Sequence, residues 1–225
     1  MNKKFFDSNV VKNAEKIILK KKNDLRLKLF FDKFLAATLL ILLSPIFLIL
    51  SILIKMEDGG PVFYRQERVT KYGKIFLIYK FRTMVNNADK IGSLVTTKND
   101  QRITKIGSFI RKNRLDEIPQ LLNILEGDMS FVGARPEVLK YVNKYSDEMK
   151  ITLLLPAGVT SRSSIDFKDE EELLLKHAKT GLSIDEIYVN EILPIKMQKN
   201  IEYIYKFNFI EDIKIMVLTF ISVIK

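Results

Sequence analysis

An uncharged run, FLAATLLILLSPIFLILSILI, occupies residues 34–54 and decides how the rest of the chain is arranged. Its 21 residues are enough for a helix to cross a bilayer core of about 30 Å. A cleaved signal peptide fits poorly, because the run is too long and no small-residue cleavage site follows it. We therefore interpret this run as a membrane helix.

Ser44 and Pro45 lie near the middle of the run. Proline removes a backbone hydrogen bond and kinks a helix, and the Ser44 hydroxyl can replace part of the lost hydrogen bonding in lipid. Two topologies are open: a kinked span, and a re-entrant hairpin whose ends return to one membrane face. Basic residues flank the run on both sides and draw both flanks to the cytoplasm, which favours a hairpin over residues 29–55.

Residues 1–28 form a basic segment in which nine lysines and arginines accompany three acidic residues. This composition predicts a helix on the membrane surface. The whole chain has a formal net charge of +10, which suits an anionic partner. Charge alone does not distinguish nucleic acid, acidic lipid and a phosphorylated small molecule.

The chain has no cysteine and one histidine, His177. Disulfides and thiolate metal sites are therefore excluded, and a metal would have to be a hard cation held by carboxylates and phosphates. Mg²⁺ is the natural candidate. We interpret His177 as a helix residue rather than a catalytic base.

Residues 56–225 are expected to form a compact cytoplasmic domain of mostly α, α+β class. The sequence predicts two short strands of a β-hairpin at residues 62–66 and 75–79, with a turn at 70–73. A polar loop is expected at 86–99, and apolar spacing predicts helices at 104–114 and 116–127. Further helices are expected near 137–154, 169–180 and 184–205, and an amphipathic helix at 210–224 is expected to lie in the membrane interface.

Asp116 and Glu117 are the candidate reacting groups. The pattern predicts Asp116 as a helix N-cap, with Pro119 in the first turn. A capping Asp beside a surface Glu would look the same, but the surrounding cations favour a phosphate site at this helix N-terminus. The cations that we assign to substrate binding are Lys80, Arg82, Arg111, Arg135 and Arg68, and Arg114 lies beside them in sequence.

At these residues the sequence resembles the bacterial sugar transferases, or monotopic phosphoglycosyl transferases, over residues 27–225. The matching stretches are the Ser44-Pro45 membrane helix, VFYRQER at 62–68, IYKFRTM at 78–84, DQRITKIG at 100–107, LDEIPQLLN at 115–123 and GDMSFVGARP at 127–136. Their order along the chain is more specific than any single motif.

The resemblance implies an enzyme on the bacterial inner membrane that faces the cytoplasm and starts cell-surface glycan assembly. It implies a UDP-sugar and undecaprenyl phosphate as substrates, Mg²⁺ as cofactor and UMP as product. Asp116 would attack the sugar-bearing phosphorus to form a phosphosugar–aspartate, and Glu117 would assist with the metal. No nucleic-acid partner is expected, and a homodimer is possible.

The sequence departs from the common family pattern after Pro156, where it reads AGVTSRSSIDFKDEE. Ser161, Arg162 and Ser163 are candidate sugar contacts or residues of a solvated loop. We interpret the acidic run at 169–172 as a helix start rather than a metal site. The alternative function is a non-catalytic membrane-anchored scaffold that binds anionic lipid, although such a protein has no need of the dyad; a phosphatase would hydrolyse rather than transfer.

Overall fold

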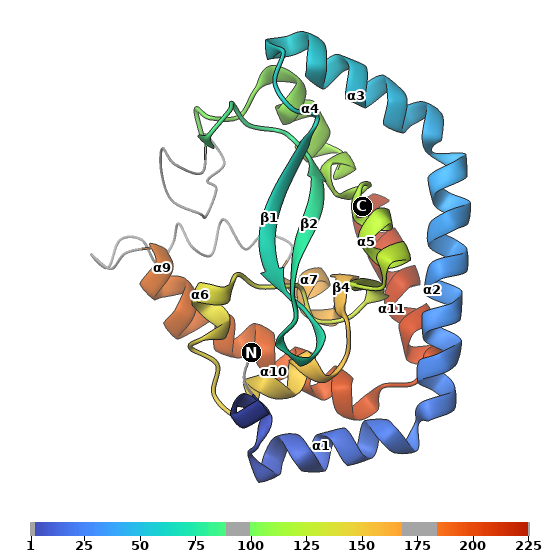
Figure 1. The fold of residues 1–225 in the computed structure, drawn as a ribbon, viewed down its shortest axis with the longest axis vertical. Coiled ribbons are helices and arrows are strands. Elements are labelled where there is room, and N and C mark those ends of the chain that lie inside the picture. The colour runs from blue at the N-terminus through green and yellow to red at the C-terminus, as the bar shows by residue number, and fades with distance from the viewer. Residues whose placement is uncertain (1–2, 89–99, 168–183, 225) are drawn as a thin grey trace.

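Three consecutive helices form a frame around one side of the computed structural model, which describes residues 3–88, 100–167 and 184–224 (Figure 1). They are α1 (Asn9–Lys20), α2 (Lys22–Leu42) and α3 (Ser44–Asp58), and a 3-10 turn at Lys3–Phe6 precedes them. The rest of the chain is a mostly helical α+β fold, which confirms the predicted class. The expected division between residues 28 and 29 falls inside α2, so the basic segment continues into the membrane helix without a break.

The apolar run is broken where Ser44 and Pro45 predict a break. α2 and α3 meet at a bend of 63°. Pro45 has no amide hydrogen, so the carbonyl of Ile41 loses its usual helical donor. The Ser44 Oγ atom donates to that carbonyl at 2.8 Å. Ser44 therefore replaces the hydrogen bond that Pro45 removes.

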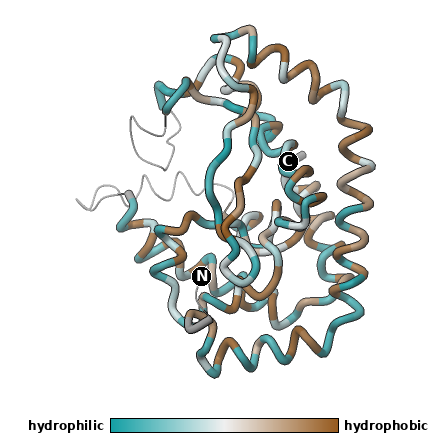
Figure 2. Tube along the Cα trace, in the orientation of Figure 1, coloured by the Kyte–Doolittle hydropathy of each residue, from teal (hydrophilic) through white to brown (hydrophobic). Residues whose placement is uncertain are grey.

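No single helix of the described residues is long and apolar enough to cross a bilayer, whereas the bent pair α2–α3 passes that test by length and composition. Hydrophobic residues recur along both helices (Figure 2), and many of their side chains are exposed. They include Phe30, Phe34, Ile41, Leu48 and Ile52. The bend alone fits both a kinked span and a re-entrant pair, so the hairpin remains a prediction.

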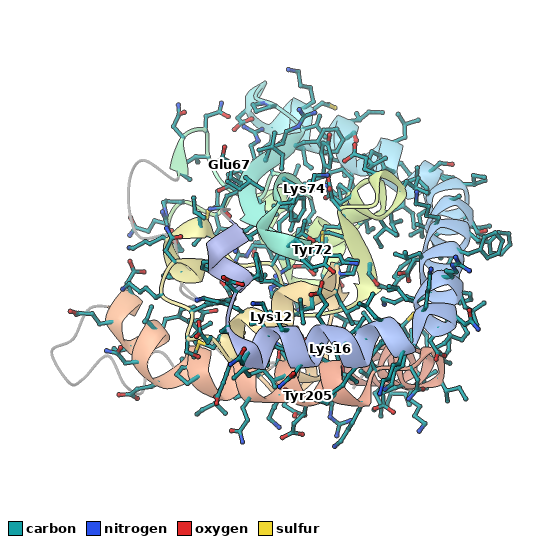
Figure 3. All side chains as sticks on the ribbon, turned by 60° about the horizontal axis from the view of Figure 1, so that its bottom comes forward. Lys12, Lys16, Glu67, Tyr72, Lys74 and Tyr205 are labelled. Atoms are coloured by element: carbon teal, nitrogen blue, oxygen red, sulfur yellow. The ribbon has the colours of Figure 1, made fainter. Side chains whose placement is uncertain are left out.

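The basic helix α1 packs its apolar stripe against the domain. Val11, Ala14 and Ile18 are buried in a cluster that α10 and the segment before β4 also line. The Tyr72 hydroxyl donates to Glu15 at 2.8 Å and ties α1 to the hairpin turn. Lys12 and Lys16 lie on the face of α1 that Figure 3 shows outermost. A membrane-surface role for residues 1–28 would therefore rest on exposed lysines and not on the buried stripe.

The predicted β-hairpin is present and longer than expected. Strands β1 (Phe63–Val69) and β2 (Ile75–Phe81) pair antiparallel in a register that places Phe63 opposite Phe81. The turn between them contains Tyr72 at φ 53° and Gly73 at φ 72°. A left-handed backbone at two consecutive positions suits glycine at one of them.

The next elements surround the dyad. Helix α4 (Lys105–Lys112) begins after Thr104, whose Oγ1 accepts from the amide of Gly107 at 2.9 Å. Helix α5 (Gln120–Glu126) ends at Gly127, which has φ 84°. Strand β3 (Met129–Val132) then pairs in parallel with β4 (Ala157–Thr160), a second sheet that the sequence did not predict.

The single helix predicted near 137–154 is wrong. The chain forms α6 (Leu139–Val142) and a 3-10 helix at Met149–Leu154 instead. Between them the Ser146 hydroxyl accepts from the Met149 amide at 3.3 Å. Such local side-chain bonds compete with helix propagation.

The C-terminal part is helical as predicted. α7 (Arg162–Asp166) is followed by α9 (Ile184–Ile187), a π-helical turn at Tyr188–Ile192 and α10 (Leu193–Lys206), and α11 (Phe209–Ile224) closes the chain. The helix predicted at 169–180, the acidic run at 169–172 and His177 lie outside the described residues. Exposed Val217, Phe220 and Ile221 give α11 an apolar outer face, and its place in the membrane interface remains a prediction.

A buried ion cluster fastens the bent helix pair α2–α3 to the domain. Lys28 of α2 is 1% exposed. Its Nζ atom donates to Asp212 of α11 at 2.7 Å and to the carbonyl of Val132 at 2.8 Å. Asp32 lies 3.7 Å from the same nitrogen and accepts from the Ser130 hydroxyl at 2.7 Å. One side chain thus joins α2, β3 and α11.

Replacing Lys28 with Met is expected to lower the free energy of unfolding by about 3–5 kcal/mol, because the buried carboxylates of Asp32 and Asp212 would lose their cation. Thermal unfolding of the purified protein in one detergent measures the change. Lys16→Met removes an exposed lysine of α1 and is the matched control. Equal melting temperatures for the two variants would show that the cluster does not hold the fold together.

Candidate active site

Asp116 and Glu117 lie in a 3-10 turn, Leu115–Glu117, between α4 and α5. Arg114 enters this turn with φ 56°, and Pro119 precedes α5 without a side-chain cap. The prediction that Asp116 caps an α-helix is therefore wrong, because the helix starts four residues later at Gln120. The tighter turn places two adjacent carboxylates beside the hairpin.

Lys80 and Arg135 hold Glu117 from two sides. Lys80 Nζ of β2 donates to Glu117 Oε1 at 3.0 Å. Arg135 Nη2, in the loop after β3, donates to the same oxygen at 2.6 Å. Lys80 Nζ also lies 3.8 Å from Asp116 Oδ2. The structure thus brings together both predicted carboxylates and two of the five predicted cations.

The two carboxylates differ in ionisation. Burial raises the pKa of Asp116 above 3.8, and the neighbouring charge of Lys80 opposes that rise. Burial also raises the pKa of Glu117, but the charges and hydrogen bonds of Arg135 and Lys80 outweigh burial and hold that pKa well below its usual range. Glu117 is thus a fixed anion that organises cations, and Asp116 is the more basic group.

Arg111 is the third predicted cation near the dyad. It lies in the last turn of α4, and its positive charge lowers the pKa of Asp116 and that of Asp100. Arg111 is therefore close enough to Asp116 and to Asp100, at the start of the DQRITKIG stretch, to influence the ionisation of both. That position suits a contact with an anionic substrate approaching Asp116.

Arg68 and Arg82 have protein partners. The guanidinium of Arg68 donates to Gln66 Oε1 at 2.6 Å and to the carbonyl of Pro136 at 3.0 Å, next to Arg135. Arg82 is 7% exposed, and both its Nη atoms bond to Asp58. The structure does not bring either side chain into contact with the dyad.

Asn123 is a residue of the site that sequence reasoning missed. Its side chain is fully buried in α5, accepts from the amide of Tyr79 at 2.9 Å and donates to the carbonyl of Leu77 at 2.9 Å. These bonds fix β2, and with it Lys80, against the helix that follows the dyad. The available signal was an amide, Asn123, between the apolar neighbours Leu122 and Ile124.

The candidate sugar contacts in the loop after β4 have structural partners. Ser161 caps α7 by accepting from the amide of Ser164 at 2.9 Å. Ser163 is buried and donates to Asn200 at 2.9 Å. Arg162 is exposed and lies 3.9 Å from Asp166. These contacts give Ser161 a capping role and tie Ser163 to α10.

The described residues contain no group of three or more side chains of the types that bind metals. Two adjacent carboxylates nevertheless fit Mg²⁺, which commonly takes one or two carboxylates and completes its shell with substrate phosphates and water. The bonds from Lys80 and Arg135 use Oε1 of Glu117, so Oε2 is the oxygen that would approach a cation.

Comparison with known proteins gives a consistent result. A family model described as bacterial sugar transferase matches residues 23–225. The chain is 45% identical over 125 residues to a putative undecaprenyl-phosphate N-acetylgalactosaminyl 1-phosphate transferase of Bacillus subtilis, covering 56% of this chain and 70% of the relative.

Two further relatives match more of the chain. An uncharacterized sugar transferase of Bacillus subtilis is 33% identical over 193 residues, covering 86% of this chain and 85% of that protein. The UDP-glucose:undecaprenyl-phosphate glucose-1-phosphate transferase of Escherichia coli is 33% identical over 84% of this chain, which spans 38% of its length.

Lys80→Met is expected to move the acid limb of the kcat/KM profile to higher pH. The Asp116 carboxylate must be ionised to act as a nucleophile or base, so the rate falls as pH drops through its raised pKa. Lys80 keeps that pKa from rising further, and its removal raises it. Rates measured from pH 4 to 9 in a constant buffer system test this. If Lys80→Met lowers the rate but leaves the acid limb where it is, Lys80 does not control the ionisation of Asp116.

Proposed function

The chain belongs to the bacterial sugar transferase family, and from that membership we propose that it transfers a phospho-sugar from a UDP-sugar to undecaprenyl phosphate and releases UMP. The observation that carries this proposal is the dyad: a basic carboxylate, Asp116, beside a carboxylate that two cations keep ionised. A protein that only binds anionic lipid has no need of this pair.

Asp116 is the nucleophile in this proposal. Its carboxylate oxygen attacks the sugar-bearing phosphorus, a new P–O bond to Asp116 forms, and the P–O bond to the UMP phosphate breaks. UMP leaves with that electron pair. The undecaprenyl phosphate oxygen then attacks the same phosphorus, which forms the lipid diphosphate sugar and returns Asp116 as a carboxylate.

Two steps suit this chemistry because both substrates are phosphate anions. A covalent intermediate separates one difficult displacement into two easier ones and keeps the two anions from meeting directly. Lys80, Arg111 and Arg135 surround the dyad and stabilise the charge on the transferring group.

Glu117 takes a supporting role. Because Lys80 and Arg135 hold Oε1 and lower the pKa of the carboxylate, Glu117 is the weaker nucleophile of the two acids. Glu117 would hold Mg²⁺, which when bound neutralises charge on the substrate phosphates. The low pKa of Glu117 keeps it ionised over the whole working range of pH.

We place the enzyme on the inner membrane, with α2 and α3 inserted from the cytoplasmic side. The bent pair with exposed apolar side chains, followed directly by the elements of the site, supports this placement. A polyprenyl phosphate presents its charge at the headgroup level, where an active site beside the membrane helices meets it. The sugar, the glycan pathway and a homodimer are left to experiment.

Incubation with a UDP-sugar labelled at its β-phosphorus, without lipid acceptor, is expected to label a peptide that contains Asp116. A panel that includes UDP-N-acetylgalactosamine and UDP-glucose, scored by UMP release, first identifies the accepted sugar. Asp116→Asn should abolish the adduct, because the amide is not a nucleophile. Glu117→Gln should slow adduct formation and weaken its Mg²⁺ dependence.

Undecaprenyl phosphate should discharge the label from the wild-type protein. Label on Glu117 would reverse the roles of the dyad. UMP release that requires the lipid, without any adduct, would contradict the covalent route. Label that water discharges as fast as the lipid does would identify a phosphatase.

A cytoplasmic hairpin predicts that both ends of the membrane pair lie on one side. Asn9→Cys and Ser146→Cys each introduce a single exposed thiol into this cysteine-free chain. In intact cells both thiols should be shielded from an impermeant maleimide and should react after permeabilisation. Labelling of one thiol alone in intact cells would establish a span.

A further inference from the structure

The last two residues of α3 are acidic, which is unfavourable for an isolated helix. Glu57 and Asp58 lie where the helix dipole is negative, so each carboxylate costs free energy there. Lys55 offsets part of this by donating to the carbonyl of Gly59 at 2.7 Å. Contacts outside the helix can offset the rest of this cost. Each of the two acids has such a partner in the candidate active-site domain.

Asp58 binds Arg82 through both carboxylate oxygens. Arg82 Nη1 donates to Oδ2 at 2.9 Å, and Nη2 donates to Oδ1. Nη1 also donates to Asn86 at 2.7 Å. The fit is close, because a methyl group added at Gly60 would lie 2.0 Å from Arg82 Nη1. A bidentate pair of this kind fixes direction as well as distance.

Glu57 holds the start of α4. Its Oε1 accepts from the amide of Ile106 at 3.1 Å, one of the amides that a helix N-terminus leaves without a partner. Beneath these polar contacts, Leu50 and Ile54 of α3 pack with Phe81 of β2 and Ile110 of α4 in one buried cluster. The C-terminal end of α3 is therefore packed against β2 and α4 together.

Both elements lead directly to the reacting groups. Lys80 of β2 precedes Arg82 by two residues, and Arg82, one residue past the strand, still pairs with the hairpin through its amide, which donates to the carbonyl of Val62 at 2.9 Å. α4 carries Arg111 and runs into the turn that holds Asp116. A shift at the end of α3 would move these groups relative to each other.

We propose that Glu57, Asp58 and Arg82 are positioning residues: they clamp the C-terminal end of the membrane helix pair to β2 and α4, and so set the placement of Lys80 and Asp116 for the reaction. Arg82 then acts through Asp58 and not on the substrate, unlike its sequence-based assignment. This inference rests on the proposed transferase function.

A double-variant cycle tests the clamp. Asp58→Asn and Arg82→Gln are each expected to lower kcat by about 10- to 100-fold with little change in KM for the UDP-sugar, because small displacements of catalytic groups cost about 10²-fold. The double variant should lose no more than the worse single variant, since both remove the same contact. A fall in kcat at unchanged KM distinguishes misplacement of the reacting groups from a loss of substrate binding.

Glu57→Ala tests the clamp separately at α4, and Asp147→Asn, which removes the exposed pair of Asp147 with Lys150, is the matched control. Glu57→Ala should lower kcat while the control leaves it unchanged. Melting temperatures are measured for all variants, and Glu57→Ala carries the test if Arg82→Gln does not fold.

Three results would overturn the clamp. Losses of Asp58→Asn and Arg82→Gln that multiply, with a larger loss at Arg82, would make Arg82 a substrate ligand. Unchanged kcat in Asp58→Asn and Arg82→Gln would leave the contacts merely structural, and wild-type kcat in Glu57→Ala would exclude its role. A parent protein inactive with every UDP-sugar would instead refute the transferase function itself.

Discussion

The site depends on one oxygen atom, Oε1 of Glu117, which accepts from Lys80 and Arg135 together. These cations come from a strand and a loop that are 55 residues apart, counted from 80 to 135. Without the carboxylate the two positive charges would repel each other and the turn that carries Asp116 would lose its attachment to β2. Because Glu117 is committed to this structural task, Asp116 is the carboxylate left to react.

The bent helix pair α2–α3 is fastened to the domain near both ends. Lys28 joins the start of α2 to β3 and α11 inside the protein, and Asp58 joins the end of α3 to Arg82. Between these two fastenings the pair bends by 63° and exposes apolar side chains. In our proposal the helix pair therefore both anchors the protein and positions the catalytic residues. It keeps the reacting carboxylate at a fixed depth relative to the lipid headgroups.

Sequence patterns predicted the β-hairpin, the break between α2 and α3, and the Asp116–Glu117 dyad, because each of these patterns involves neighbouring residues in the chain. Pro45 and Ser44 act on one carbonyl, that of Ile41, four and three residues away, and Thr104 caps the helix it precedes. Three features depend on residues that are distant in sequence. They are the parallel pairing of β3 with β4, the 3-10 turn at Asp116 in place of the predicted helix cap, and the pairing of Arg82 with Asp58. A cation in a motif can face a phosphate or an aspartate equally well, and only the fold distinguishes the two.

The central claim is that the phosphorus passes through Asp116 on its way to the lipid. Each in-line displacement inverts the configuration at phosphorus, so two displacements restore it and one reverses it. A UDP-sugar carrying sulfur of known configuration at its β-phosphorus can be turned over with undecaprenyl phosphate, and the configuration of the lipid product can then be determined. The account predicts retention of configuration; inversion would show that the lipid phosphate attacks the UDP-sugar directly and would contradict it.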